Sequence, residues 1–171
     1  MSEQKTLNPQ IEDIINEVLI SEIRENALNF VAFLHANEFQ MEFNPNEYEE
    51  GKWTGAIGGV VGDSIAYMLI HPGTESLSPW VIWLNEYDFD CDCSPSDEEL
   101  KEFIRNNLNQ CGKCHSDWEK CRGGEKTVFG KEFNSLCHSP IYFAVPDAQK
   151  LGKLKQLLLK IKRNRNDVQH N

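Results

Sequence analysis

The spacing of apolar residues predicts helical structure at the start of the chain. Between residues 9 and 37, apolar positions recur three and four apart from Ile11 to Leu34, which is typical of an amphipathic helix. Asn8-Pro9 resembles a helix start, because Asn can accept a hydrogen bond from a free N–H group and Pro fits the first helical position. We therefore expect one long helix, or two helices broken near Ser21.

The pattern then changes to that of strands. Phe39, Met41 and Phe43 alternate with other residues, and segments 64–71 and 79–85 are rich in β-branched and aromatic side chains. These two segments are apolar on both faces, so each strand could pack on the core with one face and line a pocket with the other. The aromatic side chains could wall a ligand pocket or simply fill the core. They are Trp53, Tyr67, Trp80 and Trp83.

Two further helices are predicted in the second half of the chain. Ser96 has Glu99 three residues later, a capping-box pattern, and an apolar face follows up to Leu108. A strand over 140–145 then leads through Pro146-Asp147 into a helix with leucines on one side. These elements predict an α+β fold with packed helices and a mostly antiparallel sheet of about four or five strands.

The length of 171 residues allows one sizeable core, so we expect a single domain over residues 1–171. Its expected parts are a helical N-terminus (about 9–37), a sheet (about 39–86), a helix with a cysteine-rich loop (about 96–137), and a strand with a C-terminal helix (about 140–163).

Charge and hydropathy narrow the function classes. With 17 basic and 27 acidic residues, the net charge of −10 makes nucleic acid an unfavourable partner, because phosphates would be repelled. The C-terminal helix is locally basic, which is typical of a solvated helix face. The first residues lack the apolar core of a signal peptide, and no apolar run could span a bilayer. We therefore expect a cytoplasmic protein with no membrane association.

Clustered cysteines are the strongest chemical signal. Four of the six cysteines, Cys111, Cys114, Cys121 and Cys137, follow the spacing Cys-x2-Cys-x6-Cys-x15-Cys. Two thiolates on one tight turn can occupy neighbouring vertices of a zinc tetrahedron, and two later cysteines would complete a closed site. Because a reducing compartment disfavours disulfides, we expect a structural zinc ion, Zn²⁺, at these residues.

Other residues could extend this site. Cys91 and Cys93 lie in an acidic stretch, and His115 and His138 each neighbour a cysteine, so these four are candidate additional metal ligands. Glu132 could activate a zinc-bound water only if one cysteine were missing from the coordination shell.

The same thiols allow two other interpretations. Cys111-Gly-Lys-Cys114 resembles a redox dithiol, although a thioredoxin-like context needs a strand before the first cysteine and here a helix is expected. The cysteines could also be inert thiols without metal.

The second half of the chain resembles a known family. Cys111-x-x-Cys114 is followed by Lys126-Thr-Val-Phe-Gly-Lys-Glu-Phe133, by Cys137, and by Val145-Pro-Asp147 before a leucine-rich basic helix. In these motifs, and in the strand Trp80-Val-Ile-Trp83, the chain is similar to a family of small uncharacterised bacterial proteins found largely in Clostridia-like Firmicutes. Its members carry a tighter cysteine cluster, whereas a longer insert precedes Cys121 here. The resemblance supports treating the cysteines as a group and implies no reaction.

Together these features predict a cytoplasmic module that binds a small molecule or a protein and is stabilised by zinc. An enzyme is the less favoured class, and we expect no catalytic residue outside the cysteine stretch. The alternatives are a thiol redox protein using Cys111 and Cys114, and a protein interaction module that docks through the apolar stripe from Leu151 to Ile161 of the C-terminal helix. A concave aromatic pocket would favour the binding module, and a reactive dithiol would favour the redox protein. An uncovered stripe would favour the interaction module.

Overall fold

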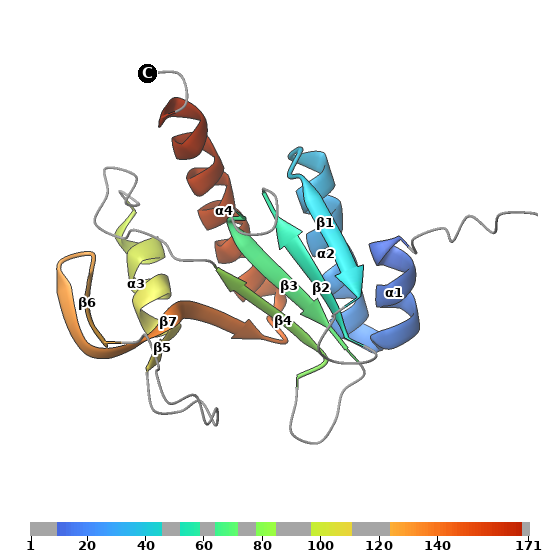
Figure 1. Cartoon of the computed structure of the whole chain (residues 1–171), viewed down its shortest axis with the longest axis horizontal. Helices are drawn as coiled ribbons and strands as arrows, with labels where there is room; N and C mark the ends of the chain where they lie inside the picture. Colours follow the sequence, from blue (N-terminus) through green and yellow to red (C-terminus); the bar gives the residue numbers. More distant parts are fainter. Residues whose placement is uncertain are drawn as a thin grey trace, which may run out of the picture.

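The computed structural model describes residues 10–45, 52–58, 64–71, 78–84, 97–110 and 124–168, without the side chains of residues 110, 138–140 and 164–168. These ranges contain four helices and seven strands (Figure 1). In chain order they are α1 (Ile11–Val18), α2 (Ser21–Ala36), β1 (Met41–Pro45), β2 (Trp53–Ile57), β3 (Ala66–Ile70), β4 (Trp80–Leu84), α3 (Glu98–Asn106), β5 (Leu108–Gln110), β6 (Gly124–Val128), β7 (Lys131–Ala144) and α4 (Ala148–Val168).

The strands form one antiparallel sheet in the order β1-β2-β3-β4-β7-β5, and β6 also pairs with β7. The predicted α+β class with a mostly antiparallel sheet is thus confirmed. The predicted number of strands was too low, because β5, β6 and the first half of β7 lie in the range 96–137, where we expected a helix and a loop. These strand segments are short and polar, so the alternation of apolar and polar residues gives only a weak signal for strands there.

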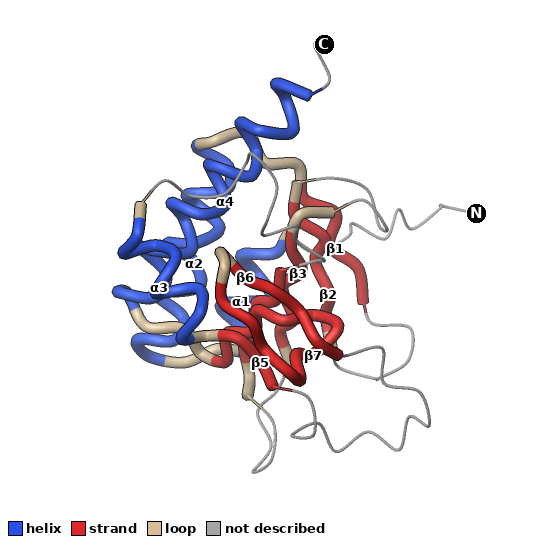
Figure 2. Tube along the Cα trace, turned by 90° about the vertical axis from the view of Figure 1, so that its left-hand side faces the viewer, coloured by secondary structure: helices blue, strands red, loops and turns tan. Residues whose placement is uncertain are grey.

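The helices cover one face of the sheet. Figure 2 shows them on one side of the molecule and the strands on the other, and Figure 1 looks onto the strand side with α2 and α4 behind it. Alternate residues of each strand therefore point towards the helices, as Ala66, Met68 and Ile70 of β3 do, and all three are buried. The fully buried side chains of this helix–sheet layer include Ile15, Phe30, Leu34, Met68, Trp80, Ile82, Ile104 and Leu136.

The N-terminal helical region consists of two helices, which is one of the two forms that we predicted. Leu19 and Ile20 are extended, and Ser21 has a left-handed φ of 49° where α2 begins. Gln10 precedes α1 without a side-chain cap, and the expected cap at Asn8-Pro9 lies outside the described residues.

Helix α3 begins one residue later than the capping-box pattern indicated. The cap is Asp97, whose carboxylate accepts hydrogen bonds from the backbone N–H of Glu99 at 2.9 Å and of Leu100 at 3.4 Å. Ser96, the predicted cap, lies outside the described residues. The helix ends at Asn106, and strand β5 (Leu108–Gln110) follows, whereas we expected the apolar face of the helix to continue to Leu108.

The turn from β7 into α4 agrees with the prediction at Pro146-Asp147. The Asp147 carboxylate accepts a hydrogen bond of 2.8 Å from the backbone N–H of Lys150. Before it, the backbone N–H of Val145 donates to the Trp80 carbonyl over 2.8 Å. Val145 adopts a φ of 43°, which is unusual for a β-branched residue and is fixed by this contact with β4.

The leucine stripe of α4 is buried. Its residues pack on the core beneath α2 and α3, so no uncovered apolar stripe remains on the described part of α4. They are Leu151, Leu154, Leu157, Leu158 and Ile161. The observation that would favour an interaction module docking through this stripe is therefore not met.

Several α4 lysines are engaged within the chain. The Lys162 ammonium donates to the carbonyls of Asn37 at 2.6 Å and Glu38 at 2.8 Å, where α2 ends. A cation at a helix C-terminus is stabilised by the helix dipole and by the free carbonyls. Lys153 pairs with Glu99 of the α3 first turn at 2.6 Å. The basic face of α4 thus joins α4 to α2 and α3.

Two glycines give a matched pair of stability predictions. At Gly55 the ring of Phe43 occupies the position of an added Cβ, whereas Gly152 in α4 has nothing within 4 Å of it. We expect Gly55→Ala to destabilise the fold by about 1–3 kcal/mol through overpacking. Gly152→Ala should stabilise it by about 0.5–1 kcal/mol because Ala is the better helix former. Urea unfolding midpoints measure both, and equal shifts in one direction would contradict the assigned packing.

Candidate functional site

The four aromatic residues expected around a pocket are divided between the two faces of the sheet. Trp80 is fully buried among the helices, with its ring centroid 6.4 Å from that of Phe30 in α2. Trp53 lies opposite Ile70 on the same face, where it stacks on Phe43 with 5.9 Å between ring centroids. These two tryptophans therefore pack with the core, and they do not share a wall with Tyr67 and Trp83.

Tyr67 and Trp83 lie on the other face, together with Tyr142, which was not among the predicted pocket residues. Tyr67 of β3 is opposite Trp83 of β4, and Trp83 is opposite Tyr142 of β7. The rings of Tyr67 and Trp83 stack with centroids 5.4 Å apart. We call these three residues the aromatic row, because they lie side by side across three neighbouring strands.

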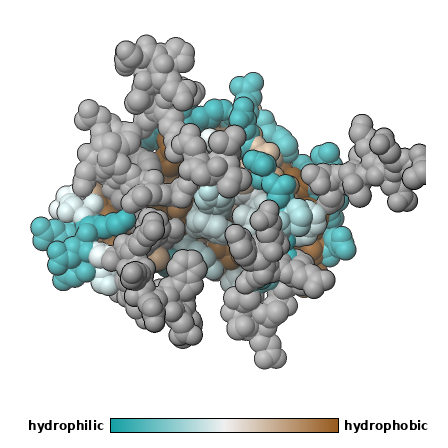
Figure 3. Space-filling model, viewed as in Figure 1, coloured by the Kyte–Doolittle hydropathy of each residue, from teal (hydrophilic) through white to brown (hydrophobic). Residues whose placement is uncertain are grey.

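The face around the aromatic row carries little charge. Strand pairing places ten described residues on it, of which only Glu42 is charged. Figure 3 looks onto this side, and the described atoms in its middle are mostly pale, between more hydrophilic regions. The two cross-strand sets are Glu42, Ala56, Tyr67, Trp83 and Tyr142, and Asn44, Thr54, Leu69, Val81 and Ala144.

Tyr142 is the most accessible member of the row. It is 42% exposed, and within the described part of the chain its hydroxyl has no hydrogen bond and its ring no ring contact. Partial burial raises the pKa of its phenol above the ordinary value of 10.0. The phenol is therefore neutral near pH 7 and can donate a hydrogen bond. The alternation of Ile141 and Phe143 with Tyr142 was visible in the sequence, but the pairing with Trp83 was not.

Most of the predicted metal ligands lie outside the described residues. This holds for Cys91, Cys93, Cys111, Cys114, His115 and Cys121, and the side chain of His138 is also undescribed. Cys137 belongs to β7, is half-buried and forms no disulfide. The part of the chain that the structure describes contains no group of three or more His, Cys, Asp or Glu side chains suited to a metal ion.

The strands that lead into and out of the cysteine segment meet beside Cys137. Gln110, the last residue of β5, pairs with Leu136, and so does Gly124, the first residue of β6. Strands β5 and β6 thus flank β7 next to Cys137, each about 4.8 Å away. The residues between these two strand ends, 111–123, carry the other three cysteines of the predicted set.

The Phe129-Gly130 motif is the turn of the β6–β7 hairpin. Both residues have positive φ, 50° and 73°, as a two-residue type I′ turn requires. An aromatic residue is unusual in this conformation, and Arg105 of α3 holds it. The Arg105 guanidinium donates to the Phe129 carbonyl at 2.6 Å, and its carbon lies 5.7 Å from the Phe129 ring centroid. The motif therefore fastens the hairpin to α3.

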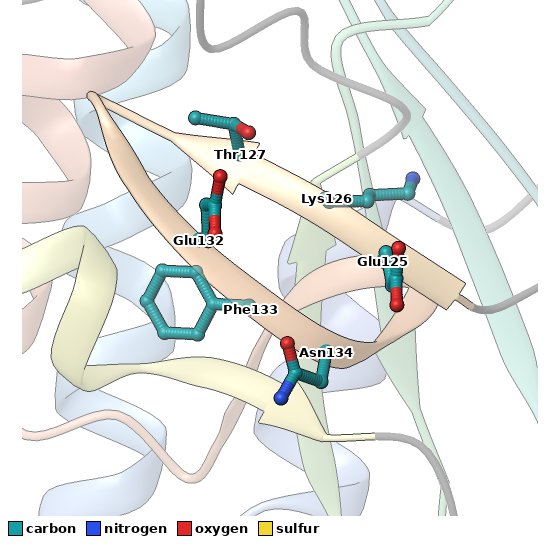
Figure 4. A pocket seen from close by; sticks show the side chains of 6 residues that line it. All are labelled: Glu125, Lys126, Thr127, Glu132, Phe133 and Asn134. Carbon is teal, nitrogen blue, oxygen red and sulfur yellow. The ribbon is translucent and has the colours of Figure 1, made fainter.

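The hairpin also borders an open hollow of about 230 Å³ (Figure 4). This volume lies below the range of about 300–1,000 Å³ that is usual for small-molecule sites. Glu132 lines the hollow and is exposed, and Lys131 lies over the Phe133 ring with its ammonium 5.5 Å from the centroid. Among the described residues, Glu132 therefore lies on an exposed strand of the hairpin, at the edge of an open hollow. The lining residues are Glu125, Lys126, Thr127, Glu132, Phe133 and Asn134.

Comparisons with known proteins add no assignment. No protein-family model matches the chain, and neither a curated protein nor a solved structure does. Within the described residues, no helix combines the length and the apolar character that crossing a membrane requires.

Arg105 gives a testable prediction for the hairpin. Arg105→Lys keeps the charge and removes the planar donor group that reaches the Phe129 carbonyl, so we expect a loss of about 1.5–3 kcal/mol of stability. Lys101→Gln is the control, because among the described residues Lys101 pairs with the exposed Glu98 and its ammonium lies 6.0 Å from the centroid of the Phe129 ring. That change should stay within about 0.5 kcal/mol. Urea unfolding of both variants tests the difference, and an unchanged midpoint for Arg105→Lys would refute it.

Proposed function

We propose that this chain is a cytoplasmic ligand-binding module that uses the aromatic row as its binding surface and zinc as a structural ion near Cys137. The observation that carries the binding proposal is the register that aligns Tyr67, Trp83 and Tyr142 on the sheet face opposite the helices. Aromatic side chains offer large contact areas at low entropic cost and often dominate binding energies. In this row they are partly exposed, whereas Trp80 already has its packing partners in the core.

The dimensions of the row favour a small molecule over a protein partner. Its three residues span two strand spacings, about 10 Å. A stable protein interface needs about 800 Å² from each partner, which is far more than three side chains provide. The buried stripe of α4 removes the other surface that we considered for a protein partner.

Neutral fragments test the binding surface. In two-dimensional NMR spectra, millimolar phenol, cyclohexanol and butanamide should shift the Trp83 indole N–H and the backbone amides of Tyr67 and Tyr142. Trp83→Leu removes the indole signal and should weaken the response of the Tyr67 and Tyr142 amides about tenfold or more, since a stacked aromatic contact is lost. Phe133→Leu, which alters an aromatic residue of the hairpin hollow, is the matched control and should leave the response unchanged. Shifts confined to the hairpin would transfer the binding surface there.

The zinc proposal concerns Cys111, Cys114, Cys121 and Cys137. It is supported by the convergence of β5 and β6 on β7 at Leu136, because both strands that border the segment 111–123 then lie beside Cys137. A closed four-thiolate site would clamp this segment and contribute folding energy directly. The resemblance to the small bacterial proteins with a cysteine cluster supports the same grouping and remains part of this proposal.

Metal analysis tests the ligand set. Protein purified without added metal or chelator should contain about one zinc ion per chain, as a closed tetrahedral site predicts. Cys137→Ser should reduce the retained zinc to about one tenth or less, because three thiolates hold the ion weakly. Ser135→Ala, at an exposed position of β7 two residues before Cys137, is the control and should retain the metal. Full zinc content in Cys137→Ser would remove that residue from the site.

One observation favours a second candidate function, thiol redox chemistry. A strand, β5, directly precedes Cys111, where the apolar pattern predicted a helix. A strand before the first cysteine is one of the two elements that a thioredoxin-like dithiol needs. Protein without zinc, in which Cys111 and Cys114 react readily with a thiol reagent or form a disulfide, would make this candidate the leading one.

A further inference from the structure

Strand β1 forms an open edge of the sheet. Among the described residues it pairs with β2 alone, and Figure 1 shows it at the margin of the sheet with no described strand beyond it. The side chains of its five residues, Met41–Pro45, are exposed or half-buried, and none is buried. An edge strand presents N–H and C=O groups that can pair with the strand of another molecule.

A hydrogen bond at the start of β1 shows which of its backbone groups face β2. The N–H of Gly58 donates to the carbonyl of Gln40 over 2.8 Å, and the pairing of Met41 with Ile57 places these two residues opposite each other. In an antiparallel pair, only alternate residues exchange hydrogen bonds with the neighbouring strand. The backbone groups of Glu42 therefore point towards β2, as those of Gln40 do.

The outward backbone groups come from Met41, Phe43 and Pro45. Because proline has no N–H, the open edge offers N–H donors from Met41 and Phe43 and carbonyl acceptors from all three residues. Phe43 is the middle residue of the strand and provides both kinds of group. Its ring lies on the helix side of the sheet, opposite Gly55, where it stacks on Trp53.

A second copy of the chain could pair with this edge in several registers, and two residues of β1 decide among them. With a two-fold axis at Glu42, the two Glu42 side chains would lie directly opposite each other, which is destabilising for like charges. With the axis at Asn44, the outward groups of Phe43 would meet Pro45 of the partner, which has no N–H to donate. An axis at either end of the strand would pair fewer residues.

A two-fold axis at Phe43 uses the outward backbone groups best. Each Phe43 N–H then donates to the carbonyl of the partner's Phe43, and each Met41 N–H donates to the carbonyl of the partner's Pro45. The N–H that Pro45 lacks is needed only at the two ends of the paired segment, where the Met41 carbonyl can turn to water.

The side chains of this register match as well. Glu42 lies opposite the partner's Asn44, whose amide can donate to the carboxylate. The same two groups already interact within the chain, where Asn44 Nδ2 lies 3.3 Å from Glu42 Oε1. The two Phe43 rings become cross-strand neighbours beside their stacks on Trp53, and aromatic cross-strand pairs stabilise a sheet.

We propose that this chain forms a homodimer in which β1 pairs antiparallel with β1 of a second copy, about a two-fold axis at Phe43. This inference goes beyond the proposed function and depends on neither the aromatic row nor zinc. The paired edge is only about 17 Å long, and small interfaces are typical of weak complexes, so we expect a dissociation constant of about 1–100 μM. Because each chain has a net charge of −10, salt should strengthen dimerisation by screening the repulsion.

Sedimentation velocity of the full chain at rising concentration measures the association. Asn44→Asp places a carboxylate opposite the partner's Glu42 at both ends of the axis, so it should weaken dimerisation about tenfold. Adding Glu42→Lys to this variant makes the same pair attractive and should restore dimerisation. Asn134→Asp makes the same change at an exposed position of β7, and this control should dimerise as the unmodified chain does.

Met41→Pro provides a second test that does not depend on charge. It removes an outward N–H and no hydrogen bond to β2, which is the position where an edge strand tolerates proline. Dimerisation should weaken while the far-ultraviolet circular dichroism stays unchanged. Together with Asn44→Asp, this variant keeps the proposal testable if one of the two fails to fold.

Hydrogen exchange distinguishes a second copy from other occupants of the edge. The amides of Met41 and Phe43 should be protected well above the measured dissociation constant and exchange rapidly well below it. Protection that does not depend on concentration would mean that the same chain covers the edge, and this would overturn the dimer. A monomer at every concentration, or a dimer that both Asn44→Asp and Met41→Pro leave intact, would also overturn it.

Discussion

Strand β7 is the constraint on which the described fold depends, because its 14 residues pair with three other strands. Its last residues extend the helix-covered sheet through β4, and its first residues form the hairpin with β6. In between, β5 and β6 pair with it from opposite edges at Leu136. A one-residue slip of β7 would turn Phe143 out of the core and bury Tyr142, so the register fixes the core and the aromatic row together.

The long periodic elements could be predicted from the sequence because the spacing of apolar residues within each element follows the positions that are buried. The apolar residues of α1, α2 and α4 recur at helical intervals, and β3 and β4 are strongly β-forming, so their positions were close to those observed. The split of α1 from α2 near Ser21 and the cap at Asp147 followed from local chemistry.

Other features depend on contacts between residues far apart in the sequence, which the spacing of apolar residues does not show. The strands β5 and β6 are short and polar, and they exist because β7 supplies their hydrogen bonds. The sequence did not show on which face of the sheet each tryptophan lies, because β4 is apolar on both sides. Only the pairing of Trp80 with Ile70 and of Trp83 with Tyr67 places the two tryptophans on opposite faces. Tyr142 was missed for the same reason, because its neighbour lies 59 positions earlier in the chain, at Trp83. Local patterns therefore define elements, whereas the candidate surface is a product of their pairing.

Gln110 and Gly124 both pair with Leu136, and this pairing also determines how strongly the fold constrains the length of the segment between them. The two strand ends lie about 10 Å apart, two strand spacings, whereas the 13 residues from 111 to 123 could reach about 43 Å if fully extended. Because the cost of closing a loop rises only slowly with its length, residues can be added or removed here at little expense to the sheet. The pairing at Leu136 thus sets where the two strand ends lie, and it places little limit on the number of residues that join them.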